Sequence, residues 1–129
     1  MKKLTLAAAQ ITCQDGNEQD NLARATQMAE QAKMQGAQLV LFPEFMPQGY
    51  LLIPALWDSA EPFDGPTTRW LSETSRRLGI YLGTSFLEVR NGHFFNTFTL
   101  SDPSGKILGA VRKRNPSMWE AYFFKGERG

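Results

Sequence analysis

Apolar residues are arranged in two ways along this chain, as short continuous runs and as a stripe at helical spacing. Residues 3–12 form a nearly continuous apolar run, which predicts a buried first strand. A stripe at helical spacing follows, and Gly36 is expected to end that helix. Asp15, with Glu18 three positions later, predicts an acidic cap at the start of the helix. Residues 38–42 predict a second strand, and the helical stripe consists of Leu22, Ala25, Met28, Ala29 and Ala32.

Residues 43–66 contain five of the seven prolines, so we expect a long irregular segment there. One short helical turn is predicted near residues 55–58. Long loops in compact domains are often functional. Thr67 is expected to cap a second helix that ends at Leu78 and is closed by Gly79. The inward residues of that helix are predicted to be Trp70, Leu71, Thr74 and Leu78.

The last part of the chain predicts three consecutive strands. Residues 80–89 and 94–100 flank Asn91-Gly92, a strong hairpin signal. A turn at residues 102–105 leads to the final strand at residues 107–113. The full order is β-α-β-α-β-β-β, an α/β fold. Helical crossovers join parallel strands and tight turns join antiparallel ones.

This topology brings two side chains together. Glu44 follows the second strand and Lys113 ends the fifth, and these two strands are predicted to run in the same direction. Both residues should therefore emerge from the same edge of the sheet, where ligands bind in open α/β sheets. The sequence alone thus predicts a site that contains a carboxylate and an ammonium group.

Composition bounds the class of protein without identifying it. The 129 residues fit one domain, and the net charge of +1 gives no sign of a nucleic-acid or membrane surface. No apolar run is long enough to span a bilayer. Met1-Lys2-Lys3-Leu4 resembles the start of a signal peptide, but Gln10 and Thr12 interrupt the apolar stretch and favour a strand. A single cysteine suits a reducing, cytoplasmic compartment.

Glu44 and Lys113 suit amide chemistry, although each also has a simpler interpretation. Phe42 and Phe45 should partly desolvate Glu44 and raise its pKa toward the range of a general base, while a facing lysine would favour the ionised form. Lys113 could stabilise the oxyanion of a tetrahedral intermediate. Alternatively, Glu44 is a strand-end acid paired with a basic neighbour. Lys113, between Arg112 and Arg114, would then belong to a solvated basic turn.

Six short motifs in register resemble the carbon–nitrogen hydrolase (nitrilase) superfamily. They are Ala9-Gln10, Phe42-Pro43-Glu44 with Gly49-Tyr50, Asn96-Thr97, Asp102-Pro103-Ser104-Gly105-Lys106, Arg112-Lys113-Arg114 with Pro116, and Glu120 before Phe123-Phe124-Lys125-Gly126. The resemblance implies the first half of an α-β-β-α sandwich. It also implies cleavage of a small non-peptide amide, or less readily a nitrile, without a metal or organic cofactor.

The same resemblance assigns roles to residues. Glu44 resembles the general base and Lys113 the lysine that stabilises the tetrahedral intermediate. Glu120 resembles a second glutamate that orients that lysine and the substrate. Tyr50 is expected either to line the substrate pocket or simply to pack against other aromatic residues. For Glu120 the alternative is a surface acid beside Trp119.

The family's nucleophile is a cysteine on a later segment, which this sequence does not include. Cys13, the single cysteine, is expected to lie at the same sheet edge as Glu44 but to be a passive small hydrophobic residue. His93 is expected to be a solvated turn residue. Trp57, Trp70 and Trp119 are expected to be core or interface residues.

A partial sandwich should expose one apolar face of its sheet. We therefore expect residues 1–129 alone to be inactive and to self-associate, or to need a complementing C-terminal half. The terminal aromatic cluster of Trp119, Tyr122, Phe123 and Phe124 would lack its covering segments. Two alternatives stay open: a non-enzymatic interaction module related to these hydrolases, and the product of a truncated gene.

Overall fold

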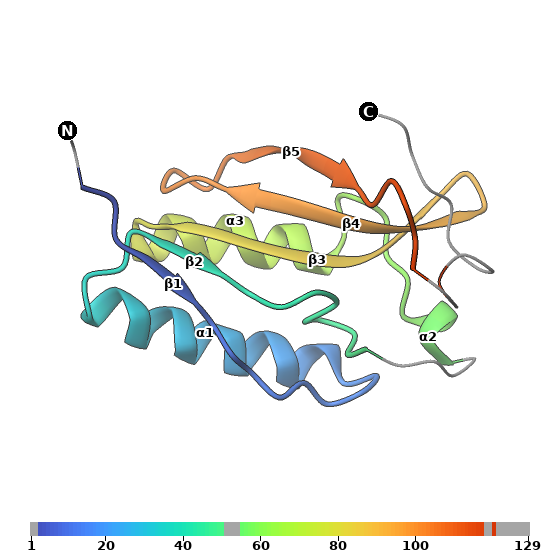
Figure 1. The fold of residues 1–129 in the computed structure, drawn as a ribbon, viewed down its shortest axis with the longest axis horizontal. Helices are drawn as coiled ribbons and strands as arrows, with labels where there is room; N and C mark the ends of the chain where they lie inside the picture. The colour runs from blue at the N-terminus through green and yellow to red at the C-terminus, as the bar shows by residue number, and fades with distance from the viewer. Residues whose placement is uncertain (1–2, 51–54, 118–119, 121–129) are drawn as a thin grey trace.

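The computed structural model describes residues 3–50, 55–117 and Glu120 as one sheet flanked by helices (Figure 1). The strands follow one another across the sheet in chain order, from β1 to β5. The predicted short turn at residues 55–58 is a helix with the same bounds. The elements are β1 (Leu6–Ala8), α1 (Glu18–Met34), β2 (Leu39–Leu41), α2 (Ala55–Asp58), α3 (Pro66–Leu78), β3 (Tyr81–Arg90), β4 (His93–Ser101) and β5 (Ile107–Arg112).

The strand directions are those predicted from the connections. β1, β2 and β3 are parallel neighbours, and β4 runs antiparallel to both β3 and β5. Asn91 and Gly92, with φ of 50° and 72°, form the tight turn between β3 and β4. Positive φ at both central residues matches the twist of a two-residue hairpin. The carboxyl ends of β2, β3 and β5 therefore lie at one edge of the sheet.

Two predicted helix caps were wrong, although both helices are present. Asn17, not Asp15, caps α1, because its side chain accepts a hydrogen bond from the backbone N–H of Asp20 at 3.2 Å. At α3 the capping residue is Gly65 with Pro66 in the first helical position, and Thr67 already lies inside the helix. Gly79, in the left-handed conformation, ends α3 as predicted.

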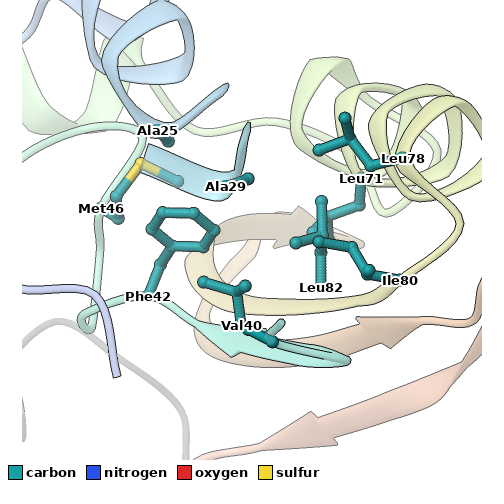
Figure 2. Packing of buried hydrophobic residues seen from close by; sticks show 10 residues of the cluster. Ala25, Ala29, Val40, Phe42, Met46, Leu71, Leu78, Ile80 and Leu82 are labelled. Carbon is teal, nitrogen blue, oxygen red and sulfur yellow. The ribbon is translucent and has the colours of Figure 1, made fainter. Parts of the chain in front are cut away.

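The hydrophobic core lies between the sheet and the two long helices (Figure 2). Ala25 and Ala29 of α1 are small enough to let this helix approach the sheet closely. Trp70 packs at the border, where its indole N–H donates to Thr26 Oγ1 at 2.8 Å. The buried cluster consists of Ala25, Ala29, Ala37, Val40, Phe42, Met46, Leu71, Leu78, Ile80 and Leu82.

The opposite face of the sheet is open, which corrects the prediction of a buried first strand. β1 has three residues rather than ten, and Leu6 is 59% exposed. The reason is that β1 is an edge strand and none of the described segments packs on this side of it. Phe45 and α2 cover the face only farther along, at Leu87 and Phe94. Phe98 of β4, and Leu108 and Val111 of β5, are exposed as well, with Val111 at 68%.

Three further expectations from the sequence concern membrane spans and aromatic residues. None of the helices among them is both long and apolar enough to cross a membrane. The predicted aromatic cluster of Trp119, Tyr122, Phe123 and Phe124 lies outside the described residues. Trp57, by contrast, packs on Phe94 with ring centroids 4.6 Å apart, in agreement with a core role.

Candidate active site

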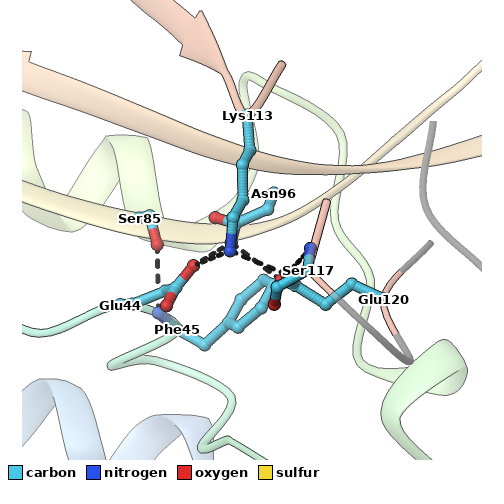
Figure 3. A network of polar contacts seen from close by, with 7 residues as sticks. All are labelled: Glu44, Phe45, Ser85, Asn96, Lys113, Ser117 and Glu120. Atoms are coloured by element: carbon cyan, nitrogen blue, oxygen red, sulfur yellow. Dashed lines mark hydrogen bonds and ion pairs between the residues drawn. The ribbon is translucent and has the colours of Figure 1, made fainter. Parts of the chain in front are cut away.

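Glu44 and Lys113 meet at the sheet edge, as the topology predicted (Figure 3). Glu44 follows β2 and Lys113 directly follows β5. The Nζ atom of Lys113 lies 2.9 Å from Oε1 of Glu44. The side chains are 30% and 43% exposed, respectively, so neither is deeply buried. The predicted convergence is confirmed, and it includes the ion pair of the simpler interpretation.

Glu120 joins the same ammonium group from the other side. Its Oε2 lies 2.7 Å from Lys113 Nζ, and its side chain is fully buried. Lys113 is thus held between two carboxylates, one partly exposed and one sealed from solvent. The interpretation of Glu120 as a surface acid is wrong.

Asn96 of β4 connects the two carboxylates directly. Its Nδ2 donates to Oε1 of Glu44 and, at 3.2 Å, to Oε1 of Glu120. In the sequence, Asn96 stands out only as part of a motif, and no role follows from it. Because Asn96 is buried, its amide fixes both carboxylates relative to the sheet.

Ser117 holds Glu120 through its backbone and its side chain. The backbone N–H and the hydroxyl of Ser117 both donate to Glu120 Oε2, at 2.8 and 2.6 Å. The backbone N–H of Glu120 in turn donates to the Ser117 carbonyl oxygen at 2.7 Å. A glutamate three residues after a serine is the pattern of a capping box, so the sequence carried a signal for this contact.

These contacts decide the charge states of Lys113 and Glu120. Burial alone would raise the pKa of Glu120, but hydrogen bonds from Lys113, Ser117 and Asn96 outweigh it and lower the pKa below its ordinary value. Burial would lower the pKa of Lys113, but its bonds to Glu120 and Glu44 raise it. Both residues are therefore charged at neutral pH.

The backbone around Glu44 is fixed by neighbouring strands. Phe45 has a φ of 53°, unusual for a residue with a bulky side chain. Its N–H donates to the hydroxyl oxygen of Ser85 at 3.0 Å, and Thr84 Oγ1 donates to the carbonyl oxygen of Pro43 at 3.1 Å. These contacts from β3 hold the turn in its strained conformation and so determine where Glu44 points.

A hollow of about 330 Å³ opens beside the pair and is more apolar than polar. All hydrogen bonds that Glu44 makes to described residues fall on Oε1, which leaves Oε2 able to accept a proton. The lining combines a carboxylate, an ammonium and an apolar wall. It is formed by Phe42, Glu44, Ser85, Asn96, Phe98, Val111 and Lys113.

Tyr50 lies near this site and is 47% exposed. Its ring centroid is 5.7 Å from that of Phe45. Burial and the charges of Glu120 and Glu44 raise its pKa, while a hydrogen bond with Ser117 and the charge of Lys113 oppose this. The packing interpretation is confirmed by the contact with Phe45. Tyr50 is not among the residues that line the hollow, so its role in a substrate pocket stays a prediction.

Cys13 and His93 do not belong to the site. Cys13 is half-buried against the helix-side core and is not among the residues that line the hollow. Burial and the charge of Asp15 raise the pKa of its thiol, while Arg24 opposes them. A raised pKa disfavours the reactive thiolate. His93 is the exposed first residue of β4, as expected of a turn histidine.

A buried ion pair that sequence reasoning missed lies behind Lys113. Arg112 Nε and Nη2 each donate to Glu88, to Oε2 and Oε1 respectively, both at 2.7 Å. Thr97 Oγ1 donates to Oε2 at 2.6 Å, and Glu88 is almost completely buried. Neighbouring residues of a strand point to opposite faces, so this pair fixes the end of β5 while Lys113 reaches into the site.

Comparison with known proteins finds similarity to one family across almost the whole chain. The family model for carbon–nitrogen hydrolases matches residues 5–128. N-carbamoylputrescine amidase from Solanum lycopersicum is 30% identical over 98% of this chain, and omega-amidase from Danio rerio is 36% identical over 88%. The chain spans 45% and 40% of their lengths, corresponding to their N-terminal part.

Solved structures agree with the fold. A carbon–nitrogen hydrolase from Helicobacter pylori superposes with a TM-score of 0.87 at 21% identity, covering 97% of this chain and 45% of that one. A variant amidase from Nesterenkonia sp., with acrylamide added to its active-site cysteine, superposes with a TM-score of 0.87 at 27% identity, covering 98% and 51%. The fold is thus about half of a nitrilase-type fold, and the chain belongs to the carbon–nitrogen hydrolase family.

Proposed function

We propose that this chain supplies the acid–base half of an amidase active site. Glu44 is the general base, Lys113 stabilises the tetrahedral intermediate, and Glu120 orients Lys113. The observation that carries the proposal is the ammonium of Lys113, held at 2.9 and 2.7 Å between two carboxylates at the wall of a hollow. A cation fixed in this way can stabilise an oxyanion without having to move.

The nucleophile in this proposal is a cysteine thiolate from outside the 129 residues, because Cys13 neither lines the hollow nor has a lowered pKa. Glu44 Oε2 takes the thiol proton as the sulfur attacks the amide carbon. The protonated carboxyl then gives this proton to the departing amine, leaving a thioester. Glu44 next takes a proton from the water that attacks the thioester and gives it to the departing sulfur, which frees the acid and restores the thiol.

The substrate class proposed is a small linear amide or carbamoyl compound. The relatives named above are amidases, and the acrylamide adduct of the Nesterenkonia enzyme involves a small amide at its active-site cysteine. In the present chain, the apolar wall of Phe98 and Val111 suits the carbon chain of such a molecule. A nitrile is the less favoured alternative.

The open face of the sheet supports a requirement for a covering partner. Val111 and Phe98 belong both to this exposed face and to the hollow, so whatever covers the face also closes the site. We propose a C-terminal half of the hydrolase, with a second copy of this chain as the alternative. An interaction module without catalysis is the second candidate function, favoured by the same exposed face.

The test is complementation. The chain alone should not hydrolyse propionamide above background. When mixed or co-expressed with the cysteine-bearing C-terminal segment of a related amidase, it should hydrolyse the amide, and Glu44→Gln should abolish that activity. Glu73→Gln, on the exposed side of α3, is the matched control. Turnover by the chain alone that Cys13→Ser removes would contradict the assignment of the nucleophile.

A further inference from the structure

A second group of polar side chains is buried below the turn that carries Glu44. Gln48, four residues after Glu44, is fully buried. Its Nε2 donates to Oε1 of Glu61 at 3.0 Å, and its Oε1 accepts from the backbone N–H of Leu87 at 3.2 Å. Gln48 thus joins the turn to β3 and to Glu61.

Glu61 is only 4% exposed, and both its carboxyl group and its backbone are hydrogen-bonded. Thr67, in the first turn of α3, donates its backbone N–H to Oε2 at 2.8 Å and its hydroxyl to Oε1. The backbone of Glu61 is bonded to Leu87 and Val89 of β3. A Cβ atom at Gly65 would lie 2.5 Å from Oε2, so only a glycine at position 65 leaves room for the carboxyl group here.

Glu18, the first residue of α1, brings a second carboxyl group to this place. Its carboxyl group lies beside that of Glu61, close enough for a hydrogen bond if one of the two carries a proton. Its Oε1 is buried, and no donor from the described residues reaches it. A carboxylate can only accept hydrogen bonds, so two carboxyl groups can bond to each other only if one of them carries a proton.

Among the residues that the structure describes, no positive charge acts on this pair that would replace the proton. The groups that act on Glu18 are Glu61 and Thr67, and those that act on Glu61 are Thr67, Gln48 and Glu18. Burial, the charge of Glu61 and the contact with its carboxyl group together raise the pKa of Glu18 to about 7, while Thr67 opposes them. Burial also raises the pKa of Glu61.

The charged groups close to this pair on α1, α3 and β3 are acidic, paired with an acid, or exposed. Arg24 of α1 lies 2.9 Å from Asp20, and Arg112 lies 2.7 Å from Glu88 of β3. Asp15 before α1 and Asp64 before α3 add negative charge, and Arg69 of α3 is exposed.

We propose that Glu18 and Glu61 share one proton, and that this proton holds α1, α3 and the Glu44 turn together. Both are positioning residues, because they act on Glu44 only through Gln48 and the backbone. The proposal does not depend on the proposed function, since it concerns the charge and geometry of the folded chain.

The route from this pair to Glu44 is short. The N–H of Gly16 donates to the carbonyl oxygen of Gln48 at 2.9 Å, and Asn21 Nδ2 donates to the carbonyl oxygen of Pro47 at 2.9 Å. The start of α1 is therefore bonded directly to the turn. When the shared proton is lost, repulsion between Glu18 and Glu61 pushes apart the segments that support Glu44.

The experiment compares the chain with the variant Glu18→Gln, which keeps the shape of the protonated acid. The control is Glu73→Gln, at an exposed position of α3. Thermal unfolding is measured from pH 5 to 9. An acid with a raised pKa in the folded state stabilises the fold at low pH and loses that contribution as pH rises. The Tm of the chain and of Glu73→Gln should fall by roughly 5 °C between pH 6 and 8 relative to Glu18→Gln.

A second measurement covers the case in which a variant folds poorly. In NMR titrations of the unsubstituted chain, the Glu18 carboxyl and the backbone amides of Gln48 and Phe45 should shift with one common midpoint near pH 7. A Glu18 midpoint near the ordinary 4.5, or parallel Tm profiles for the chain and Glu18→Gln, would overturn the shared proton. Shifts confined to α1, with Gln48 and Phe45 unmoved, would overturn the positioning of the turn.

Discussion

The backbone N–H of Lys113 donates to the carbonyl oxygen of Asn96 at 2.8 Å. The side chain of the same Asn96 binds Glu44 and Glu120. One residue therefore positions the backbone of Lys113 and also the two carboxylates around its ammonium group. The geometry of the site is therefore a property of the pairing between β4 and β5.

Removing the Asn96 side chain should loosen this arrangement. We expect Asn96→Ala to lower the free energy of unfolding by about 1–3 kcal/mol, because buried Glu120 loses a donor that it cannot replace with water. Urea denaturation at pH 7 measures the effect. Asn115→Ala, at an exposed position near the site, is the control and should be close to neutral. Equal stability of the two variants would contradict a bridging role.

Lys113→Met should destabilise the fold by about 2–4 kcal/mol at pH 7, because it leaves the buried carboxylate of Glu120 without its cation. The loss should shrink as pH falls below the ordinary Glu120 pKa of 4.5, where an unpaired Glu120 becomes neutral. Unfolding at pH 7 and pH 4 checks both points. Lys106→Met, an exposed lysine before β5, is the control. A loss that does not depend on pH would argue against the ion pair as its cause.

Ser117 should control the charge of Glu120 and not only its position. Because the Ser117 hydroxyl helps to lower the pKa of Glu120, Ser117→Ala should raise that pKa, while Ser117→Thr keeps a hydroxyl and should restore the value. Carboxyl NMR titration gives the readout directly. Identical Glu120 titrations in all three proteins would show that the backbone N–H alone is sufficient.

The buried pair behind the site is best tested by a double-mutant cycle. Arg112→Met should cost about 3–5 kcal/mol, because Glu88 keeps an uncompensated buried charge. The double variant with Glu88→Leu should recover much of this loss. Arg114→Met, an exposed arginine two residues later, provides the control. Additive losses in the double variant would mean that the two side chains are not coupled.

How far the sequence could predict this molecule depended on whether a feature follows from connectivity. Glu44 and Lys113 meet because helical crossovers and tight turns fix strand directions, and these connections are visible in the sequence. Asn96 and the Glu88–Arg112 pair depend on cross-strand register, which the apolar pattern does not encode. The apolar run at the start of the chain predicted burial for Leu6 because such a run cannot reveal whether a layer covers the strand.

The exposed sheet face should govern how the isolated chain behaves in solution. Val111 is 68% exposed on this face, next to Phe98, its partner in the pairing of β4 and β5. Exposed apolar patches on a sheet favour association. We expect the chain to elute as oligomers in size-exclusion chromatography and Val111→Lys to shift it toward the monomer.

Met34→Lys is the control, because Met34 is 80% exposed but lies at the end of α1, away from this face. If both substitutions have the same effect, association depends on general surface apolarity and the sheet face is not an interface. A shift with Val111→Lys alone means that the wall of the candidate active site is also the surface on which a partner docks.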